Sequence, residues 1–544
     1  MMYLTATVIL SLLPILNSQY IHFPTDQENE AFSSTADLAA LRGTPEYGMQ
    51  IEQIISTGNT KLALAVNKAL LQQASRENDN IVFAPVSVTV ALALVLLGAK
   101  GKTFEEVSNV MGLAAGVDIQ GKSLVVHEHL NNILKKLTKT TDSNQKLTIA
   151  SAIFVQNDYP IRSLYKQTAK NIYKSEVLNV DFKHDVNKAT QLMNAWVSER
   201  TEGKITSVLS EPPIDTTKVI IASALYFKAL WEHPFFDGMT ARKPFYTNGR
   251  NAPATMEVEM MANGGFFPYY KDPNLKCEIL GLPYRGNETT MYVIVPSSSS
   301  AARLKEFESS LTQENVDRLA DSTVSTGVVM LFPKMKIDTT INLKEVLKTL
   351  GLRSLFSPSE ANLALLSPGE AMADAPSRAS LALQAAKANP IAPEYDRRDV
   401  LVFSRSGFPE NCSKIFDKNS TEKMCETTDG SKKVLYKKFG DKVGRRVAKR
   451  DTLDIVRRIV DEQSSENFHN PGLYADQVIH KVYMDITETG TEAAASTSIS
   501  LSRDGSRLTF RVDVPFLFFI RHELTKTVLF WGSVTEPTPN FPRS

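Results

Sequence analysis

Two arginines that follow a run of small side chains are the residues of this sequence best placed for chemistry. The run, GTEAAASTS, covers residues 490–498, and Arg503 and Arg507 lie in the polar segment after it. A guanidinium binds a carboxylate through two parallel charge-assisted hydrogen bonds, so either arginine suits recognition by an acidic pocket. The segment between its strand-like flanks is about twenty residues long, and such loops are functional or disordered. Taken alone, the small residues also fit a flexible linker, and the arginines a solvated loop tip.

Motifs for enzyme chemistry are absent from the sequence. It contains no G-x-S-x-G nucleophile elbow, no H-E-x-x-H pair and no phosphate-binding P-loop. No Cys/His spacing suggests a zinc site, and the VHEH stretch at 126–129 is too short for a metal site. The sequence therefore predicts a protein with no catalytic centre, no cofactor and no metal.

Composition and charge indicate a large globular protein. The chain has 544 residues, of which 42% are hydrophobic and 22% charged, enough for a large core and more than one structural region. The formal net charge of +1 gives no global field that would point to nucleic acid or to an acidic substrate.

The N-terminus is expected to be a secretion signal. An apolar run covers residues 3–16 and is followed by Ser18, a suitable cleavage position. The run is too short to span a bilayer, and no later segment is apolar enough for a membrane span. We therefore expect residues 1–18 to be a signal peptide and the protein to be secreted and extracellular. No Lys or Arg precedes the run, and a buried or interfacial segment is the alternative.

Secretion would give a role to two cysteines and to three sequons. Cys412 and Cys425 are expected to close a local loop as a disulfide, with free thiols as the alternative. Cys277 lies in a strand-like run and is interpreted as a small buried apolar residue. The N-x-S/T sequons, glycosylation candidates on surface loops, are Asn287, Asn411 and Asn419.

Helical periodicity comes first along the chain and strand patterns follow, an order typical of an α+β fold with a large sheet. Residues 19–57 are polar and poor in pattern, and we interpret them as a mobile extension. Residues 85–101 form a nearly all-apolar helix, which should be buried on most sides. Strands are expected at 148–156, 218–231, 290–296 and 327–337.

The pattern breaks between residues 367 and 471. This stretch is charged and contains Pro, Ser and Asn throughout, and its piece 431–450 carries nine basic residues against one aspartate. We expect a flexible insertion in a surface loop, because the entropy of loop closure grows slowly with length. Its basic run is a candidate site for a heparin-like polyanion, and RRVAKR within it also fits a processing protease. Residues 58–366 and 472–538 would form the body, and residues 539–544 a short tail.

Several motifs resemble those of the serpin family and occur in the family order. NAWVSERTEGKI at 194–205 is similar to the family pattern N-x-W-V-x-x-x-T-x-G-K-I. The others are ALYFKALWEHPF (224–235), LFPKMKI (331–337), ETGTEAAAS (488–496), VPFLFFI (514–520) and TVLFWGSVTEP (527–537). The resemblance implies a fold of three β-sheets with about nine helices. It also implies an exposed reactive-centre loop, at about residues 488–510, that a protease attacks as bait.

The start of the small-residue run matches the hinge of that loop. The hinge residues are Glu488, Gly490, Thr491, Glu492, Ala493, Ala494 and Ala495. A segment can enter between two paired strands only if its inward side chains are small, because sheet interiors are close-packed. Side chains alternate between faces, so Thr491, Ala493, Ala495 and Thr497 share one face and are all small or modest. Gly490 supplies backbone freedom.

The bait bond follows from loop length and charge. Counting from Glu488 by the usual serpin loop length reaches Asp504, which is a poor bait for most extracellular serine proteases. We therefore expect cleavage at Arg503–Asp504 first, at Arg507–Leu508 second, and after Asp504 third. A trypsin-like pocket carries an aspartate that pairs with arginine. The resemblance thus implies a monomeric inhibitor that traps an extracellular trypsin-like protease in a covalent complex.

The resemblance also points to a polar cluster beneath the sheet that controls its opening. Ser87 and His480 match the family pattern, whereas Ala84 replaces the usual Ser and Ser223 the usual Asn. Trp231 takes the tryptophan position of the second motif and is assigned to the same region. A thinner hydrogen-bond network would let the sheet open more easily unless neighbours or buried water compensate.

Three functions remain open at this stage. The first is a secreted inhibitor of trypsin-like proteases, most similar to arthropod serpins that restrain clip-type cascades of immunity and melanisation. The second is a non-inhibitory serpin that acts as a binding or carrier protein, which the small hinge residues disfavour. The third is a polyanion binder that uses its basic insertion. Nothing points to a nucleic acid or a membrane as partner.

Overall fold

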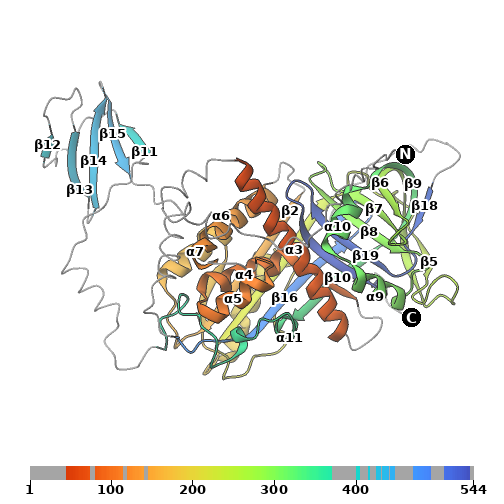
Figure 1. The fold of residues 1–544 in the computed structure, drawn as a ribbon, viewed down its shortest axis with the longest axis horizontal. Helices are drawn as coiled ribbons and strands as arrows, with labels where there is room; N and C mark the ends of the chain where they lie inside the picture. Colours follow the sequence, from red (N-terminus) through yellow and green to blue (C-terminus); the bar gives the residue numbers. More distant parts are fainter. Residues whose placement is uncertain are drawn as a thin grey trace, which may run out of the picture. The chain divides into compact units, whose positions relative to one another are not determined.

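The chain divides into two compact units, described separately here from a computed structural model (Figure 1). Unit 1 comprises residues 1–370 and 459–544, and unit 2 comprises residues 371–458. The structure describes residues 45–73, 80–113, 119–139, 145–370, 400–404, 414–416, 424–429, 432–439, 442–447, 470–491 and 508–538. The expected signal peptide, residues 1–18, and the tail, residues 539–544, lie outside the described residues.

Nine α-helices occur among the described residues, as the family resemblance implies. They are α3 (Pro45–Gln73), α4 (Pro85–Gly98), α5 (Gly101–Val110), α6 (Ile119–Thr138), α7 (Ser163–Tyr173), α8 (Val186–Arg200), α9 (Ala301–Ser310), α10 (Gln313–Asp321) and α11 (Lys344–Thr349). Figure 1 shows α4 to α7 gathered at one end of unit 1, with β6 to β9 at the other.

The interpretation of residues 19–57 as a mobile extension is wrong for residues 45–57. These residues are the first turns of α3. Ile51 and Ile55 are buried on the same helical stripe as Leu62 and Val66. Apolar residues spaced by about one helical turn form a face that packs against the core. The helical pattern is weak here because the few apolar residues of this first stretch stand among polar ones.

The apolar helix is confirmed as a fully buried element. All fourteen residues of α4 are buried, and Pro85 occupies its first turn, where a proline costs no hydrogen bond. Ala84 precedes the helix in an extended conformation, with its backbone N–H free to reach outside the helix. The helix packs against strands of the sheet described next.

A six-stranded sheet holds the segment that ends in the hinge. Its strands are β10 (Met335–Asn342), β16 (Ala475–Ile486), β17 (Gly490–Thr491), β4 (Val219–Leu230), β2 (Lys146–Gln156) and β3 (Glu176–Val180), in that spatial order. The central strands β16 and β4 are parallel and also pair directly with each other over most of their length. They are therefore joined by hydrogen bonds for most of their length, and β17 lies between them only at one end.

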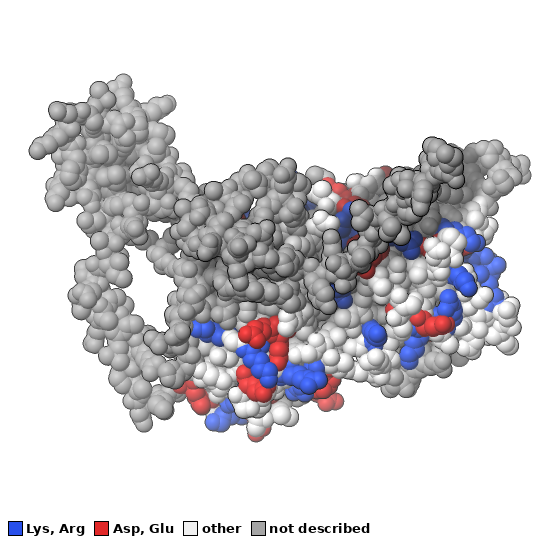
Figure 2. Space-filling model, in the orientation of Figure 1, with Lys and Arg blue, Asp and Glu red and all other residues white. Residues whose placement is uncertain are grey.

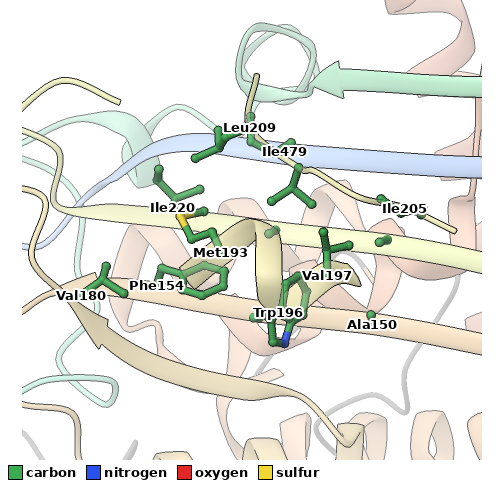
Figure 3. Packing of buried hydrophobic residues seen from close by; sticks show 14 of the residues in the cluster. Ala150, Phe154, Val180, Met193, Trp196, Val197, Ile205, Leu209, Ile220 and Ile479 are labelled. Atoms are coloured by element: carbon green, nitrogen blue, oxygen red, sulfur yellow. The ribbon is translucent and has the colours of Figure 1, made fainter. Parts of the chain in front are cut away.

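The two faces of this sheet are covered by different segments. Figure 3 shows Met193, Trp196 and Val197 of α8 packed over Phe154 and Ile220 on one face. On the other face Phe227 contacts Tyr284 and Phe530 with ring centroids 5.0 and 6.2 Å apart. Both faces are apolar and covered along most of the sheet, so the strands are buried on both sides there, as in the interior of a layered fold. Near the hinge, Lys228 and Asp485 are only half-buried.

The second sheet of unit 1 has nine strands. They are β1 (Ile81–Phe83), β20 (Thr527–Val534), β19 (Phe516–His522), β8 (Thr289–Pro296), β7 (Cys277–Pro283), β6 (Met256–Asp272), β9 (Val324–Pro333), β18 (Leu508–Arg511) and β5 (Ala241–Phe245). The resemblance implies three sheets in this body, but β6 joins two of them. Its first residues pair with β5, its last with β7, and its middle with β9, so the hydrogen bonding is continuous.

Unit 2 contains a five-stranded antiparallel sheet where the sequence predicted a flexible segment without strands. The strands are β11 (Val400–Ser404), β12 (Lys414–Phe416), β13 (Met424–Asp429), β14 (Lys432–Phe439) and β15 (Lys442–Val447). The charged residues hid the strand pattern, because basic residues occupy adjacent positions in β14 and β15 and so break the alternation that marks a strand. Cys425 lies in β13, whereas Cys412 and the sequons Asn411 and Asn419 lie outside the described residues.

The described surface of unit 1 carries charges of both signs. Figure 2 shows basic and acidic side chains interspersed on the face it draws, without a single-sign patch among its coloured residues. Within the described ranges, the longest and most apolar helices still fall short of what a membrane crossing requires.

Candidate functional site

The hinge lies at the point where the two central parallel strands separate. β16 and β4 pair as far as Tyr483 with Tyr226, and beyond that point β17 lies between them. Thr491 of β17 pairs with Ile486 on one side and with Ala229 on the other, antiparallel to both. The chain after β16 has thus turned back and begun a new central strand that is two residues long.

Gly490 is required by close approach to the neighbouring strand. A Cβ at this position would lie 2.2 Å from the carbonyl oxygen of Ala229 and 2.7 Å from the Cα of Leu230. No side chain tolerates such contacts with backbone atoms, so β17 pairs with β4 only because residue 490 has no side chain. The sequence predicted a glycine for flexibility, and the structure gives a steric reason in addition.

Thr491 is buried in a small polar niche. It is 0% exposed, and its hydroxyl lies 2.8 Å from the hydroxyl of Tyr284. Tyr284 stacks on Trp231 with a centroid separation of 4.5 Å and an interplanar angle of 17°. Because Thr491 is fully buried in a close-packed interior, a longer side chain here would have to displace its neighbours.

Trp231 holds the turn that precedes the hinge strand. Its indole Nε1 donates to the carbonyl of Thr487 at 3.0 Å, and its backbone N–H donates to the carbonyl of Thr489 at 3.1 Å. The turn is closed by the backbone N–H of Thr487, which donates to the carbonyl of Gly490 at 2.9 Å. Trp231 therefore positions the hinge directly and lies apart from the polar cluster to which the sequence analysis assigned it.

Glu488 is anchored by charge and by hydrogen bonds. Its carboxylate lies 3.0 Å from the ammonium of Lys334 and accepts a hydrogen bond from the hydroxyl of Thr240 at 2.7 Å. Burial alone would raise the pKa of Glu488, but the hydrogen bond from Thr240 and the charge of Lys334 outweigh it and lower the pKa. The backbone carbonyl of Glu488 also accepts from the N–H of Phe235 at 2.8 Å. The turn that precedes the hinge strand is thus held by an ion pair and by hydrogen bonds.

His480 links the two central strands to the helix beneath them. Its Nε2 accepts from the backbone N–H of Ala84 at 2.8 Å, so Nδ1 carries the proton and donates to the hydroxyl of Ser223 at 2.8 Å. This bridge crosses from β16 to β4 at paired residues of the ladder. The hydroxyl of Ser87 is buried without a partner among the described residues. The structure therefore brings together His480, Ser223 and the backbone of Ala84, but not Ser87.

The neutral state of His480 should make stability depend on pH. Burial lowers the pKa of His480 to about 3 from its ordinary 6.5. Between these values the unfolded chain binds a proton that the native protein does not, so this residue's contribution to stability is complete above pH 6.5 and is lost as the pH falls. We expect His480→Gln to lower the free energy of unfolding at pH 7.5 by about 1–2 kcal/mol, and with it the unfolding midpoint. The difference from wild type should narrow at pH 4.5.

Thermal unfolding followed at one scan rate and at both pH values tests this expectation. Buried His127, whose pKa burial lowers to about 4, titrates in the same window but is present in both proteins and cancels in the comparison. A difference between wild type and His480→Gln that stays constant from pH 7.5 to 4.5 would contradict a neutral His480.

The remaining predicted residues divide between described and undescribed segments. Glu492, Ala493, Ala494, Ala495, Arg503, Asp504 and Arg507 lie outside the described residues. Leu508 begins β18 and pairs with Val328 of β9 in parallel. Asn287 is exposed in the turn between β7 and β8. No group of His, Cys, Asp and Glu residues suited to a metal occurs within the described ranges.

The sequence did not indicate which residues contact the side chains of the hinge. Tyr284 contacts Thr491, and Lys334 and Thr240 contact Glu488. They come from three segments of the nine-stranded sheet region and share no spacing with the hinge or with each other. Lys334 falls within the LFPKMKI motif and was the one signal available, although the motif by itself does not say which acid the lysine pairs with.

Comparisons with known proteins agree with this geometry. A family model described as "Serpin (serine protease inhibitor)" matches residues 57–388 and 455–537. "Serine protease inhibitor 28Dc" of Drosophila melanogaster is 29% identical over 86% of this chain and 77% of its own length. "Intracellular coagulation inhibitor 2" of Tachypleus tridentatus is 32% identical over 54% of this chain and 71% of its own length.

A solved structure has the same fold. The crystal structure of Serpin48 from the insect Tenebrio molitor covers 89% of this chain and 99% of its own, with 23% identity and a TM-score of 0.61. The family model spans well over half of this sequence, and the hinge stands between the two central strands in the sheet. On these grounds the chain belongs to the serpin family.

Proposed function

We propose that this serpin is a secreted suicide-substrate inhibitor of trypsin-like serine proteases. The family includes relatives that are named as protease inhibitors, which supports the general assignment. The specific support is the hinge: a buried two-residue strand that already occupies the entry between β16 and β4. An inhibitor that works by inserting its cut loop needs such a starting point.

The observation that carries the proposal is the register of the three strands. His480 and Ser223, which pair across the closed part of the sheet, are 257 positions apart in the chain. Ile486 and Ala229, which flank Thr491 in the open part, have the same separation. From residue 494 onward, each further loop residue would therefore enter between two residues that now pair with each other. The strands need only move apart by one strand spacing, roughly 4.8 Å, without sliding.

This register assigns a place to every small residue of the loop. Ala493 would lie between Met484 and Phe227, and Ala495 between Val482 and Leu225, all four of which are buried. Because side chains alternate, these odd-numbered residues would face the covered core side together with Thr491. The cores on both sides are close-packed, and alanine is the side chain that such positions accept most easily.

The hydrogen bond between His480 and Ser223 lies where the fourth inward-facing residue of the loop would insert. Thr497 would arrive between His480 and Ser223, whose 2.8 Å hydrogen bond must break for the strands to separate. Breaking one buried hydrogen bond costs about 1–3 kcal/mol until a new partner is found, and the threonine hydroxyl is such a partner. The cluster would therefore slow opening of the intact protein without blocking the inserted end state.

Loop geometry also favours Arg503 over Arg507 as the bait residue. Leu508 is already held in the ladder of β18 and β9, which fixes the chain immediately after Arg507. In the inserted register Arg503 would lie just beyond the start of β4 at Val219, so the new strand would end where the sheet ends. Its carbonyl would then stand about 40 Å along the sheet from Thr491.

The reaction uses the chemistry of the target protease. The protease serine attacks the carbonyl carbon of Arg503, the peptide bond to Asp504 breaks, and the new amino terminus of Asp504 takes the proton from the protease histidine. The ester that remains joins the two proteins. Insertion then moves the protease and distorts its catalytic alignment, so water cannot complete hydrolysis. The serpin contributes the bait loop and no catalytic group.

The decisive experiment mixes the purified protein with trypsin. We expect a complex that resists SDS and a released C-terminal peptide whose first residue is Asp504. Arg503→Ala should form the complex with trypsin at least about 100-fold more slowly, because the bidentate contact with the specificity pocket is removed. Arg507→Ala is the matched control and should retain it. Equal loss in both variants, or a peptide that starts at Leu508, would contradict the assignment of Arg503.

Secretion and the physiological target are further parts of the proposal. The apolar run at residues 3–16 and the exposed sequon at Asn287 support passage through the secretory pathway. We propose extracellular clip-type protease cascades of immunity or melanisation as the setting. Expression in insect cells should give a secreted protein whose mobility on gels increases after treatment with an N-glycosidase. A protein retained inside the cell and without glycan would contradict this part.

Polyanion binding by unit 2 is a second candidate function. β14 and β15 pair in register, which brings Lys432, Lys433, Lys437, Lys438, Lys442, Arg445 and Arg446 into one small sheet. Clustered cations retain sulfated polyanions, with strong dependence on salt. Retention on immobilised heparin should fall after deletion of residues 430–450 while complex formation with trypsin persists. Degradation by trypsin without any covalent complex would instead favour the non-inhibitory carrier function.

A further inference from the structure

A carboxylate joins β16 to β4 at the end of the two strands that lies farthest from the hinge. Asp476 is the second residue of β16. Its Oδ2 accepts hydrogen bonds from the backbone N–H groups of Lys218 at 2.7 Å and of Val219 at 3.3 Å. Val219 is the first residue of β4, and Lys218 directly precedes it. A side chain therefore helps to close the strand pair at this end.

The pairing of the two strands is irregular at this residue. Ala475 pairs with Val219. Gln477, two residues later, pairs with Ile220, the next residue of β4, so β16 has one residue more than β4 at this point. The extra residue is Asp476. A bulge of this kind leaves its extra residue outside the ladder and changes the direction of a side chain. The carboxylate of Asp476 can therefore bind the backbone of the neighbouring strand.

The carboxylate is held in this place at an energetic cost. Asp476 is half-buried, and burial raises its pKa. The two N–H donors and the charges of Lys344 and Lys218 act in the opposite direction but do not outweigh burial. A raised pKa means that the surroundings disfavour the charged form of the carboxyl group. Release of Asp476 into water would relieve this cost.

The register of the hinge leads the end of the inserted loop to the same place. Thr491 pairs with Ala229, and the two strands are antiparallel, so each later loop residue would meet the preceding residue of β4. Leu501, ten positions after Thr491, would thus meet Val219, ten positions before Ala229. The loop residue after Leu501 would meet the residue before Val219. The two N–H groups that Asp476 binds therefore belong to the residues at which the inserted strand would end.

We propose that Asp476 occupies, in the intact protein, the place that the last inserted residues of the loop take. Its carboxylate holds the two N–H groups at the start of β4, and Leu501 and Ser502 displace it as insertion is completed. This proposal rests on the inhibitory function proposed above and adds the step in which the protease arrives at the far end of the sheet. Asp476 touches no reacting atom, so it is a positioning residue.

Hydrogen exchange at single-residue resolution tests the proposal on the full-length protein. In the intact protein, Asp476→Ala should speed exchange of the amides of Lys218 and Val219 at least about tenfold, because the carboxylate that accepts from them is lost. After cleavage of the bond that follows Arg503, both amides should exchange at the same slow rate in wild type and variant, since the loop has replaced the carboxylate. Exchange that remains tenfold faster in the cut variant than in the cut wild type would overturn the proposal.

Two further variants separate this role from a general loosening of the sheet. Asp476→Asn keeps an acceptor oxygen without the charge, so exchange in its intact form should lie between wild type and Asp476→Ala. Asp338→Ala is the matched control, because Asp338 of β10 pairs with Lys481 on the other side of β16, and exchange at the start of β4 should not change. Equal exchange at Lys218 in the intact wild type and in both variants of Asp476 would overturn the proposal. The comparison with Asp476→Asn decides the matter if Asp476→Ala does not fold.

The same measurement distinguishes this proposal from the inhibitory function on which it rests. If β4 gains no protection anywhere when the wild-type loop is cut, the loop does not insert, and both proposals are refuted. If protection increases along β4 as far as Ile220 but Asp476→Ala still exposes Val219 in the cut protein, insertion occurs without displacing Asp476. That result would overturn only the present proposal.

Discussion

Thr491→Arg should convert the protein from an inhibitor of trypsin into a substrate. The hydroxyl of Thr491 lies against Tyr284 in a niche that is 0% exposed, between Ile486 and Ala229. A guanidinium there would be buried without a counter-ion, at a cost of several kcal/mol. Since each 1.4 kcal/mol changes a rate tenfold, insertion should slow by more than about 100-fold, and hydrolysis of the acyl-enzyme would win. The measurement is the stoichiometry of inhibition together with the yield of SDS-resistant complex.

Glu492→Arg is the matched control for this substitution. By alternation residue 492 belongs to the opposite face, where its partners in the inserted register would be Asp485 and Lys228, both only half-buried. An arginine there can keep its charge in water, so inhibition should be retained. Loss of inhibition in both variants would show that the face of the loop does not matter, and the inserted-strand mechanism would be refuted.

Cutting the loop at Arg503 should raise the thermal stability of the protein. About ten residues would join the centre of the six-stranded sheet and gain ladder hydrogen bonds worth about 1 kcal/mol each, roughly 10 kcal/mol in total. In a body of several hundred residues that gain corresponds to an increase of roughly 10 °C in the unfolding midpoint. A catalytic amount of a protease that cuts the loop but forms no complex supplies the nicked protein, and both forms are compared at one scan rate because unfolding is under kinetic control.

The Thr491→Arg protein provides the control for the stability measurement. When it is cut at the same bond its loop cannot enter, so its midpoint should stay within a few degrees of the uncut form. If the wild-type protein gains no stability on cutting, the intact molecule stores no energy in its exposed loop. The family membership would stand, whereas the proposed inhibitory mechanism would not.

Elements with one strong local pattern were predictable from the sequence. The apolar stretch from Pro85 indicates a buried helix because nearly every side chain is apolar, and all of α4 is buried. The motif strands β4 and β9 were predicted from their β-branched and aromatic runs. The first turns of α3 and the five strands of unit 2 were not predicted, because few apolar residues mark the former and clustered charges mask the period of the latter.

The candidate site divides in the same way. The small residues of the hinge, their alternation and the need for a glycine follow from the sequence, since they depend on side-chain size and on the two-residue period of a strand. The identity of the residues that contact the hinge does not follow from the sequence. Tyr284, Lys334 and Thr240 reach the hinge from separate strands and loops, and their contact with it depends on the packing of one sheet region against another.

The sequence by itself therefore determined the family, the position of the loop and the residues that can enter a sheet. Only the tertiary structure decided that β16 and β4 pair in a register that Thr491 already continues, and that His480 closes the path with a hydrogen bond to Ser223. The physical reason is that strand register arises from contacts between segments more than two hundred residues apart, whose pairing no local pattern encodes.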